Sequence, residues 1–447
     1  MTHIDGRPEP KQLSPWSKHP ISRSETRRGS LLAFLAMTFA IYDFILFGTI
    51  LPDIQQHFGW SDSEATAINT AVSLGGALVL LVGGGLVVDR IGRRLGMMLT
   101  IGGTALGSAL TSIAPGAVLL VVFRSISGMG LAEQGVNSTY LNEVYALTTD
   151  SKIKNHRGFT YSMVQSGFPV GSILAAAFAA ALLPLVGWRW LFLAATFPAL
   201  LIIFMRRGLR ETPQFEVQNR IRTLRRSGSH AQAAQLAAEY GIDVDNKKVP
   251  LIEIFRGRAL RSTIVLSFAW ITNWFGILTF SILGTSVLTL GKHISFTHAL
   301  IYTVIINLVG FVGYLFHGWA GDRFGRRNVI GVGWVIAGIV FAIMLLGVTD
   351  SAAVVALYAI GMFFLIGPYA ALLFYNGECY ETHCRATGVN FLNATSQIGA
   401  VVAGSVLTSL LASGVAWSHA AFYVGAIGVF VSGFIVFFSR KEPEVAG

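Results

Sequence analysis

Long apolar stretches alternate with short polar segments along almost the whole chain. Each stretch holds enough residues to cross the ~30 Å hydrocarbon layer of a bilayer as an α-helix. This pattern predicts an all-α membrane protein with twelve transmembrane helices in two six-helix halves. The predicted spans are residues 31–52, 65–88, 95–114, 116–140, 158–183, 188–205, 260–290, 297–317, 328–347, 352–377, 386–412 and 417–438.

The polar segments divide the chain into five parts. These are an N-terminal tail at 1–30, a first half at 31–205, a linker at 206–259, a second half at 260–438 and a C-terminal tail at 439–447. The first tail is basic and has no apolar core, so we predict a disordered cytoplasmic segment and not a signal peptide. In the linker we expect one or two solvated surface helices between Gln218 and Glu239.

Composition excludes a soluble protein of this length. The 447 residues are 53% hydrophobic and only 13% charged. The net charge of +10 could indicate nucleic acid, but thirty of the 33 Lys and Arg residues fall on one side of the predicted topology. The positive-inside rule then places both termini in the cytoplasm, and no nucleic-acid partner is needed. We expect a monomeric, multi-pass protein of a bacterial inner or plasma membrane, in contact with lipid, with no metal or cofactor.

One charged motif occurs in the middle of each half. Both copies read Gly, three residues, Asp-Arg, one residue, Gly-Arg-Arg, with an offset of 233 residues. Glycine allows a tight turn, and an Asp at a helix end can pair with the following Arg. A generic basic loop explains the arginines but not the repeated Gly and Asp, so we predict a duplicated unit with a gating motif. The motif residues are Gly85, Asp89, Arg90, Gly92 and Arg93, and then Gly318, Asp322, Arg323, Gly325 and Arg326.

This repeated motif resembles the loop signature of the major facilitator superfamily between its second and third helices, with the echo between the eighth and ninth. The resemblance covers roughly Leu31 to Arg440 and implies the twelve-helix transporter fold. The segment Arg210–Phe215 (Arg-Glu-Thr-Pro-Gln-Phe) resembles the Glu-Ser/Thr-Pro-x-Phe found in metabolite:proton symporters. The motif order is most similar to that of the metabolite, sialate and aromatic acid proton symporters.

Two charges lie deep inside predicted spans. Helix rise places both Asp43 and Arg124 about 18 Å from the cytoplasmic side, so the two side chains can meet. Intramembrane acids usually mark ion or substrate pathways, although a packing ion pair is the simpler alternative. In sugar-porter relatives an acid and an arginine at these places form a proton-linked pair, which the resemblance implies for Asp43 and Arg124.

Glu133 is a second candidate for the proton carrier. It lies nine residues after Arg124 and therefore points to the opposite side of that helix, together with Asn137 and Tyr140. We do not expect it to pair with Arg124. Related symporters carry a Glu after a similar run of small residues.

An acid at one helix end precedes Arg-Gly or Arg-Ala at the start of the next in each half. The pairs are Glu143 with Arg157, and Glu378 with Arg385. We interpret them as cytoplasmic clamps that open and close as the helices move, resembling the gate networks of the superfamily.

Polar and aromatic residues fall on helical stripes that predict a polar central cavity. A single buried amide can hold two helices together, but three stripes favour a cavity. The predicted substrate contacts are Arg124, Tyr42, Asn137, Gln165, Trp270, Asn273, Trp274, Asn307, Tyr314, Tyr369, Asn390, Asn393 and Gln397.

These features favour a proton-coupled symporter that imports a small organic anion, such as a carboxylate metabolite, by alternating access. When ionised, Asp43 holds Arg124; when protonated, it releases the guanidinium to bind a carboxylate. The alternative is a facilitator or symporter of an uncharged sugar or polyol, in which the charge pair is only packing. A membrane-embedded receptor or enzyme is disfavoured because the sequence has no metal cluster, nucleophile motif or added soluble domain.

Overall fold

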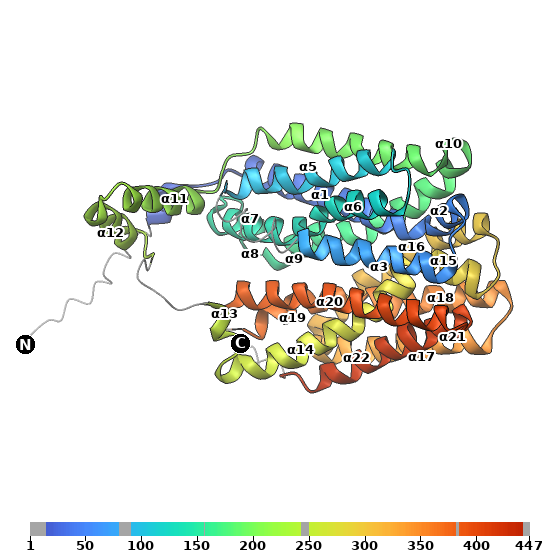
Figure 1. The fold of residues 1–447 in the computed structure, drawn as a ribbon. Coiled ribbons are helices and arrows are strands. Elements are labelled where there is room, and N and C mark those ends of the chain that lie inside the picture. The colour runs from blue at the N-terminus through green and yellow to red at the C-terminus, as the bar shows by residue number, and fades with distance from the viewer. Residues whose placement is uncertain (1–14, 80–90, 156, 243–249, 381–383, 441–447) are drawn as a thin grey trace, which may run out of the picture.

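The computed structural model describes residues 15–79, 91–155, 157–242, 250–380 and 384–440. The described residues are almost entirely helical (Figure 1). The first-half helices are α1 (Arg23–Thr49), α2 (Leu51–Phe58), α3 (Asp62–Val79), α5 (Arg93–Thr111), α6 (Ala117–Ser127), η3 (Gly128–Ala132), α7 (Glu133–Leu147), α8 (Ser151–Asn155), α9 (Arg157–Gln165) and α10 (Gly167–Arg206).

The linker and the second half complete the chain. Around the linker lie η1 (Pro15–Lys18), α11 (Pro213–Arg226), α12 (His230–Glu239) and α13 (Pro250–Glu253). The second-half helices are α14 (Gly257–Gly276), η4 (Ile277–Ile282), α15 (Gly284–Ser286), η5 (Val287–Gly291), α16 (Phe296–Phe324), α17 (Arg326–Gly347), α18 (Ser351–Ile366), α19 (Tyr369–Glu378), α20 (Arg385–Ala412), α21 (Trp417–Ala421), η6 (Phe422–Ala426) and α22 (Ile427–Phe437).

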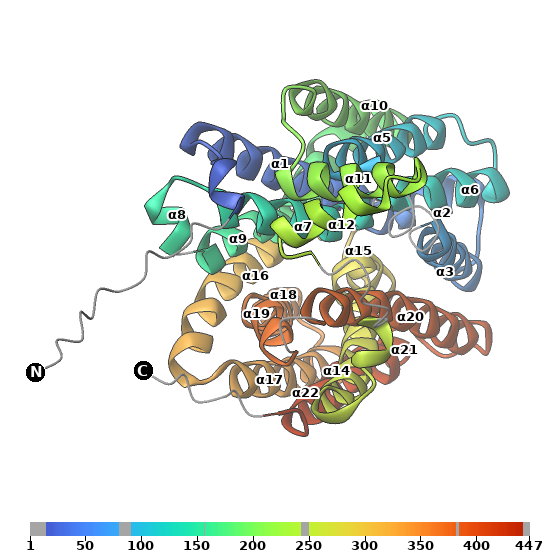
Figure 2. The ribbon, with the colours of Figure 1, turned by 90° about the vertical axis from the view of Figure 1, so that its left-hand side faces the viewer.

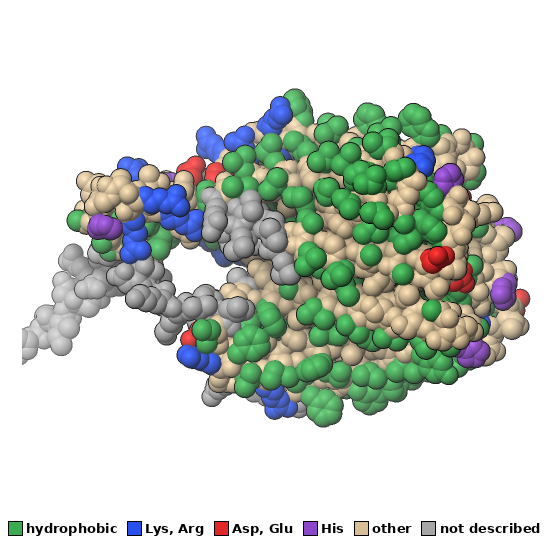
Figure 3. Space-filling model, in the orientation of Figure 1, with side chains coloured by type: hydrophobic (Ala, Val, Ile, Leu, Met, Phe, Trp, Pro, Cys, Tyr) green, Lys and Arg blue, Asp and Glu red, His purple; other side chains and the backbone are tan. Residues whose placement is uncertain are grey.

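The helices run side by side in one bundle, with α1, α5 and α10 in the upper part of Figure 1 and α17, α20 and α22 in the lower part. Helices α11 and α12 extend beyond one end, which we call the basic end because Lys and Arg gather there (Figure 3). The opposite end is called the far end. Between the two ends, apolar side chains cover the visible face, as expected of a lipid-facing surface.

Nine helical stretches in the described part of the chain are long and apolar enough to cross a membrane. One of them, Thr160–Arg206, covers two predicted spans and contains a break at Gly187, where φ is 74°. Helices α3 and α5 occupy two further predicted spans. The structure thus confirms a helical, multi-span architecture, whereas the count of twelve and the cytoplasmic termini stay predictions.

The repeated motif turns at a glycine in both halves. Gly92 has a φ of 104° and Gly325 a φ of 85°, a backbone region that side chains disfavour, and each directly precedes a helix that starts with Arg. The prediction that glycine allows the turn is confirmed. Gly85, Asp89 and Arg90 lie outside the described residues.

The predicted disordered tail requires a correction from Pro15 onward. Ser22 caps α1, which starts at Arg23, eight residues before the predicted span. Trp16 packs edge-on against Tyr240 of the linker, with ring centroids 4.7 Å apart. The tail is ordered here because α11 and α12 present an apolar surface that Trp16 covers. Figure 2 looks onto this basic end, with α11 and α12 in front of the first half.

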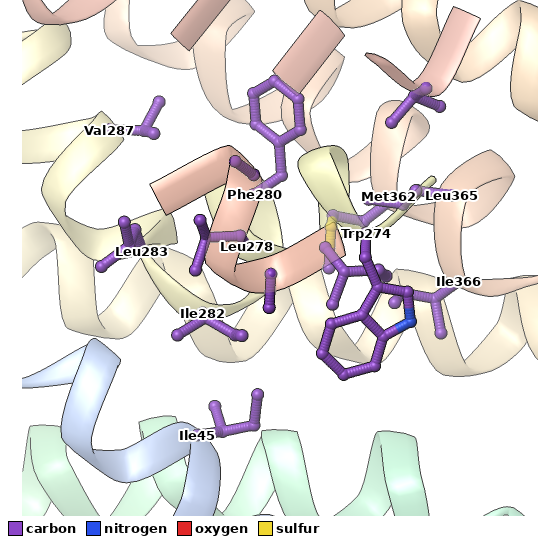
Figure 4. Close-up of a cluster of buried hydrophobic side chains, with 14 of the residues drawn as sticks. Ile45, Trp274, Leu278, Phe280, Ile282, Leu283, Val287, Met362, Leu365 and Ile366 are labelled. Atoms are coloured by element: carbon purple, nitrogen blue, oxygen red, sulfur yellow. The ribbon is translucent and has the colours of Figure 1, made fainter. Parts of the chain in front are cut away.

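The two halves touch closely toward the far end. A Cβ atom on Gly48 of α1 would clash with the carbonyl of Ile282 in η4, and one on Gly404 of α20 would clash with Thr70 of α3. Figure 4 shows Ile45 of α1 facing Ile282 across the same boundary. Apolar packing between the halves therefore closes this end.

Candidate transport site

Asp43 and Arg124 form an ion pair in the middle of the first half, which confirms the predicted contact. Nη1 of Arg124 lies 3.0 Å from Oδ2 and 3.2 Å from Oδ1 of Asp43, and Nη2 donates to the Asp43 carbonyl oxygen at 2.8 Å. The side chains are only 2% and 3% exposed. A pair so deeply buried depends on full hydrogen bonding, because desolvation is costly.

Two serines complete the carboxylate's surroundings. Ser108 of α5 donates to Oδ1 of Asp43, and Ser127 at the end of α6 donates to Oδ2. The Arg124 guanidinium also lies over two rings, 5.4 Å from the centroid of Phe47 and 5.0 Å from that of Phe192. Three helices and two aromatic rings thus hold this pair in one geometry.

A central cavity lies between the halves, about 50 Å³ in volume. It is lined by Met37, Gln134, Gln165, Phe168, Trp270, Trp274, Ile277, Tyr314, Ile366, Tyr369 and Leu373. Helices of both halves contribute, and among the described lining residues none carries a formal charge. This lining is that of a site for a small, largely apolar ring with a few polar groups.

Unpaired donors point to a ligand that accepts hydrogen bonds in this cavity. Within the described part of the chain, the Trp270 indole nitrogen and the Tyr314 hydroxyl are buried without a hydrogen-bond partner. Tyr369 is held in place, because its hydroxyl donates to Oδ1 of Asn273 at 2.6 Å and its ring meets Trp270 edge-on at 5.5 Å. Buried donors without partners are unfavourable, so a ligand oxygen there is stabilising.

The central cavity lies one helical turn from a smaller cavity that borders the ion pair. Met37 and Gln134 line the cavity, while Ala40 and Leu131, three residues away on the same stretches of chain, line a smaller cavity that touches Arg124. Three residues of α-helix correspond to ~4.5 Å. In this structure Arg124 itself is outside the central cavity.

The family model for sugar (and other) transporters matches residues 29–444. The chain belongs to this family. It is a transporter of the major facilitator superfamily and not an enzyme, which confirms the predicted family and a multi-pass location in the cell membrane.

Two named transporters are similar to this chain over most of its length. The gentisate transporter of Corynebacterium glutamicum is 26% identical over 86% of this chain and 80% of its own. The gallate transporter of Pseudomonas putida is 26% identical over 85% of each chain. The crystal structure of a D-xylose-proton symporter superposes with a TM-score of 0.69 at 17% identity, covering 94% of this chain and 98% of that one, and shows the shared fold.

A second buried ion pair joins Glu133 to Arg206, the last residue of α10. Both side chains are 0% exposed. Arg206 also donates to the Met97 carbonyl at 2.7 Å and to Oδ1 of Asn137 at 3.1 Å, while Thr100 donates to the other Glu133 oxygen. As predicted, Glu133 points away from Arg124. The break at η3 between them follows the glycine run, where a short 3₁₀ turn replaces the α-helix.

Of the two predicted clamps at the basic end, Glu143 with Arg157 requires a correction, whereas Glu378 with Arg385 stays a prediction because the Arg385 side chain lies outside what the structure describes. Glu143 pairs with Arg93, at 3.1 Å from Nη2, and Glu378 pairs with Arg326. Arg157 is exposed and starts a separate helix, and Arg385 starts α20. Glu143 reaches Arg93 because α5, which Arg93 begins, packs along α7, whereas the Arg157 side chain faces solvent.

Further contacts stiffen these pairs within each half. Asp322 lies 2.8 Å from Nη2 of Arg326, the predicted contact of a motif Asp with a following Arg. In the first half, the Glu211 carboxylate accepts the backbone N–H groups of Arg93 and Arg94 at the start of α5. Among the described residues, no ion pair joins the two halves at this end.

Several predicted substrate contacts lie outside the central cavity. Asn137 belongs to the Arg206 network, Asn307 donates to Thr303 of its own helix, and Tyr42 packs against Phe178. Asn273 lies behind Tyr369 as seen from the cavity, and its Oδ1 accepts the Tyr369 hydroxyl. The remaining three, on α20, are also absent from the lining: Asn390, Asn393 and Gln397. In the second motif copy, a Cβ atom on Gly318 would lie 3.4 Å from that of Ala370, and the Arg323 guanidinium lies over the Trp319 ring.

Sequence reasoning missed the residues that complete each site. Arg206 was assigned to the linker because it follows an apolar run and precedes Arg207, as a membrane anchor does. Ser108 and Ser127 sit among other small residues and carried no signal of their own. The prediction also left out Gln134, which lines the central cavity. Here the sequence did hold a signal, because Gln134 directly follows Glu133 at the end of a glycine-rich break.

Proposed function

We propose that this protein is a proton-coupled symporter that imports a small aromatic acid anion by alternating access. The observation that carries the proposal is the buried Asp43–Arg124 pair on the same helix, α1, that contributes Met37 to an aromatic cavity. A carboxylate that can be neutralised, beside an arginine that can bind a carboxylate, couples the two ligands chemically.

The proton acts first, by weakening the ion pair. Protonation of Asp43 removes the charge that holds Nη1 of Arg124, while the bond to the Asp43 carbonyl oxygen remains as a pivot. The guanidinium then lacks its counter-charge in a low-dielectric site. An anionic ligand therefore binds more tightly after protonation than before.

The anion then reaches Arg124 through the central cavity. Met37 lies six residues from Asp43 on α1, which is ~9 Å of helix, so the released guanidinium and the carboxylate of the ligand move toward each other as the halves rearrange. A carboxylate accepts two parallel N–H bonds from a guanidinium, which fixes its orientation. Release on the other side returns Asp43 to its ionised, paired state.

An aromatic ring fits the remaining lining. Trp270, Trp274 and Phe168 offer ring faces and edges, and Tyr314 offers a hydroxyl for a ring substituent. Relatives named as gentisate and gallate transporters support this substrate class. A cavity of about 50 Å³ is below the ~300 Å³ of typical ligand sites, so binding requires the halves to move apart.

Orientation follows from charge in this proposal. The basic end faces the cytoplasm, so the apolar contacts at the far end close the outer side. Import then needs the far end to open, with Gly48 separating from Ile282 and Gly404 separating from Thr70.

The test uses purified protein in proteoliposomes with a panel of benzoates, hydroxybenzoates and sugars. We expect substrate-dependent alkalinisation of the medium, measured with a pH electrode, for aromatic acids only. Arg124→Ala is expected to abolish uptake, and Arg124→Lys to restore it only in part, because an ammonium lacks the planar fork. Sugar uptake without proton movement would instead support the facilitator.

A further inference from the structure

A second, smaller cavity of about 20 Å³ lies against the Asp43–Arg124 pair. Its lining comes from α1, α3, α6 and η3 of the first half, and Ile282 of η4 is the contribution of the second half. It is separate from the central cavity, whose lining shares no residue with it.

Two buried donors line this cavity without a partner among the residues that the structure describes. They are Nδ2 of Asn69 and Nε of Arg124, on residues that are 2% and 3% exposed. Asn69 is otherwise held by its helix, where Ser73 donates to its carbonyl oxygen at 3.0 Å. Two unpaired donors on residues that line one small space call for a hydrogen-bond acceptor in that space.

We propose that this cavity binds one water molecule that relays the transported proton to Asp43, a role that rests on the proposed function. Volume decides the class of ligand, because one water needs ~10–15 Å³ and two to four polar partners. The cavity offers about 20 Å³ and the side chains of Asn69, Arg124 and Ser127. A chloride ion or a carboxylate group is larger than a water molecule.

Ser127 connects the cavity to the carboxylate. It lines the cavity, and its hydroxyl donates to Oδ2 of Asp43. As a proton arrives from the solvent, the bound water takes it up and donates one of its own protons to a lone pair of the Ser127 oxygen, while the Ser127 hydroxyl proton passes to Asp43. The water is left neutral, Ser127 regains its original form, and Asp43 becomes a neutral carboxylic acid, so one proton has moved and no electrons.

The proton and the substrate approach the pair from different sides. Ile282 covers the small cavity, and its carbonyl meets Gly48 in the contact that closes the far end. When the halves part there, Ile282 withdraws and the cavity opens toward that end. The central cavity lies one turn nearer the basic end, at the Met37 level.

The experiment replaces Asn69 with Leu, which has a similar volume and no donor. Uphill uptake driven by a pH gradient and counterflow at equal pH are measured on one proteoliposome preparation. We expect the initial uphill rate to fall about tenfold with a larger solvent deuterium effect, because the relay becomes limiting. Counterflow needs no net proton transfer and is expected to be retained.

Wild-type uphill rates in Asn69→Leu would overturn the water site. Equal losses of uphill uptake and counterflow would also overturn it, because they would show that Asn69 matters only for helix packing. The matched control is Thr66→Val on the same helix, whose hydroxyl bonds to the Asp62 carbonyl and is outside the cavity. It is expected to behave as wild type. If the wild type moves no protons, the proposed function fails independently of these variants.

Two further arms sharpen the test. Ser127→Ala and Ser108→Ala each remove one hydrogen bond to Asp43, but only Ser127 lines the small cavity. We expect both to shift the pH profile of uptake and only Ser127→Ala to raise the deuterium effect; equal isotope effects would contradict the relay. Replacing chloride with gluconate is expected to change nothing, and chloride dependence would show that the site binds an anion instead.

Discussion

Two buried ion pairs lie nine residues apart on the same predicted span, in opposite surroundings. Arg124 pairs with Asp43 and lines the small cavity, whereas Glu133 pairs with Arg206 among a carbonyl, a threonine and an asparagine. Neither Glu133 nor Arg206 lines a cavity described above. Both pairs are therefore deeply buried, but only the Asp43–Arg124 pair has a cavity beside it.

This difference teaches that a deeply buried charge pair is not by itself a transport site. A coupling carboxylate must exchange protons, so it needs a path to water, and its partner must be able to reach the substrate. The Asp43 pair borders the small cavity, and the central cavity lies one helical turn beyond that cavity. The Glu133 pair ties α7 to the end of α10, where the linker begins, and we interpret it as structural.

The largest effect is expected for Arg206→Ala. Removing the guanidinium leaves Glu133 as an uncompensated buried charge, which costs about 3–5 kcal/mol. Thermal unfolding in detergent should therefore shift strongly to lower temperature, with little folded protein in the membrane. Arg206→Ala with wild-type stability would contradict the structural interpretation.

The matched control for that variant removes both charges together. The double variant Glu133→Leu with Arg206→Met replaces the pair by apolar groups of similar size, so it is expected to recover most of the lost stability. Accumulation of substrate per folded molecule should also return, since neither side chain carries the proton.

A smaller effect is expected for Glu133→Gln. The amide oxygen still accepts from Arg206 but lacks the charge, so stability falls by about 1–3 kcal/mol while the pH-driven accumulation ratio stays at the wild-type level. Accumulation is measured in proteoliposomes with equal amounts of folded protein. Loss of accumulation with intact counterflow would make Glu133 the proton carrier and reverse the comparison.

The smallest effect is expected for Asp322→Asn in the second motif copy. The Asp322 side chain is 69% exposed, so its ion pair with Arg326 contributes at most about 1 kcal/mol. We expect slower turnover with unchanged substrate affinity, because the contact stiffens one half without touching the substrate. A changed dissociation constant at unchanged turnover would show a direct role in binding.

The sequence predicted the helical, multi-span architecture, the glycine turns of the repeated motif and the contact of Asp43 with Arg124. Apolar length and the positive φ of Gly92 and Gly325 follow from local rules, and helix rise is regular enough to match the depth of two charges. These are properties that one helix or one turn carries alone.

The sequence did not predict which face of each helix looks into the cavity. The stripe of Trp270, Asn273 and Trp274 is nearly right, yet Asn273 lies behind Tyr369. Helix rotation depends on packing against several neighbours, and π-helical segments such as Ile277–Ile282 shift the register. Arg206 was missed for a related reason, since its acid partner comes from a distant helix.

The most direct test of the whole account is Asp43→Asn in proteoliposomes, with radiolabelled aromatic acid. The amide imitates the protonated carboxyl permanently, so Arg124 stays released and substrate counterflow at equal pH is retained. Uphill accumulation under an imposed pH gradient is predicted to be lost, because no proton can bind or leave. Wild-type uphill accumulation by Asp43→Asn would remove Asp43 from the coupling and leave the ion pair as structure.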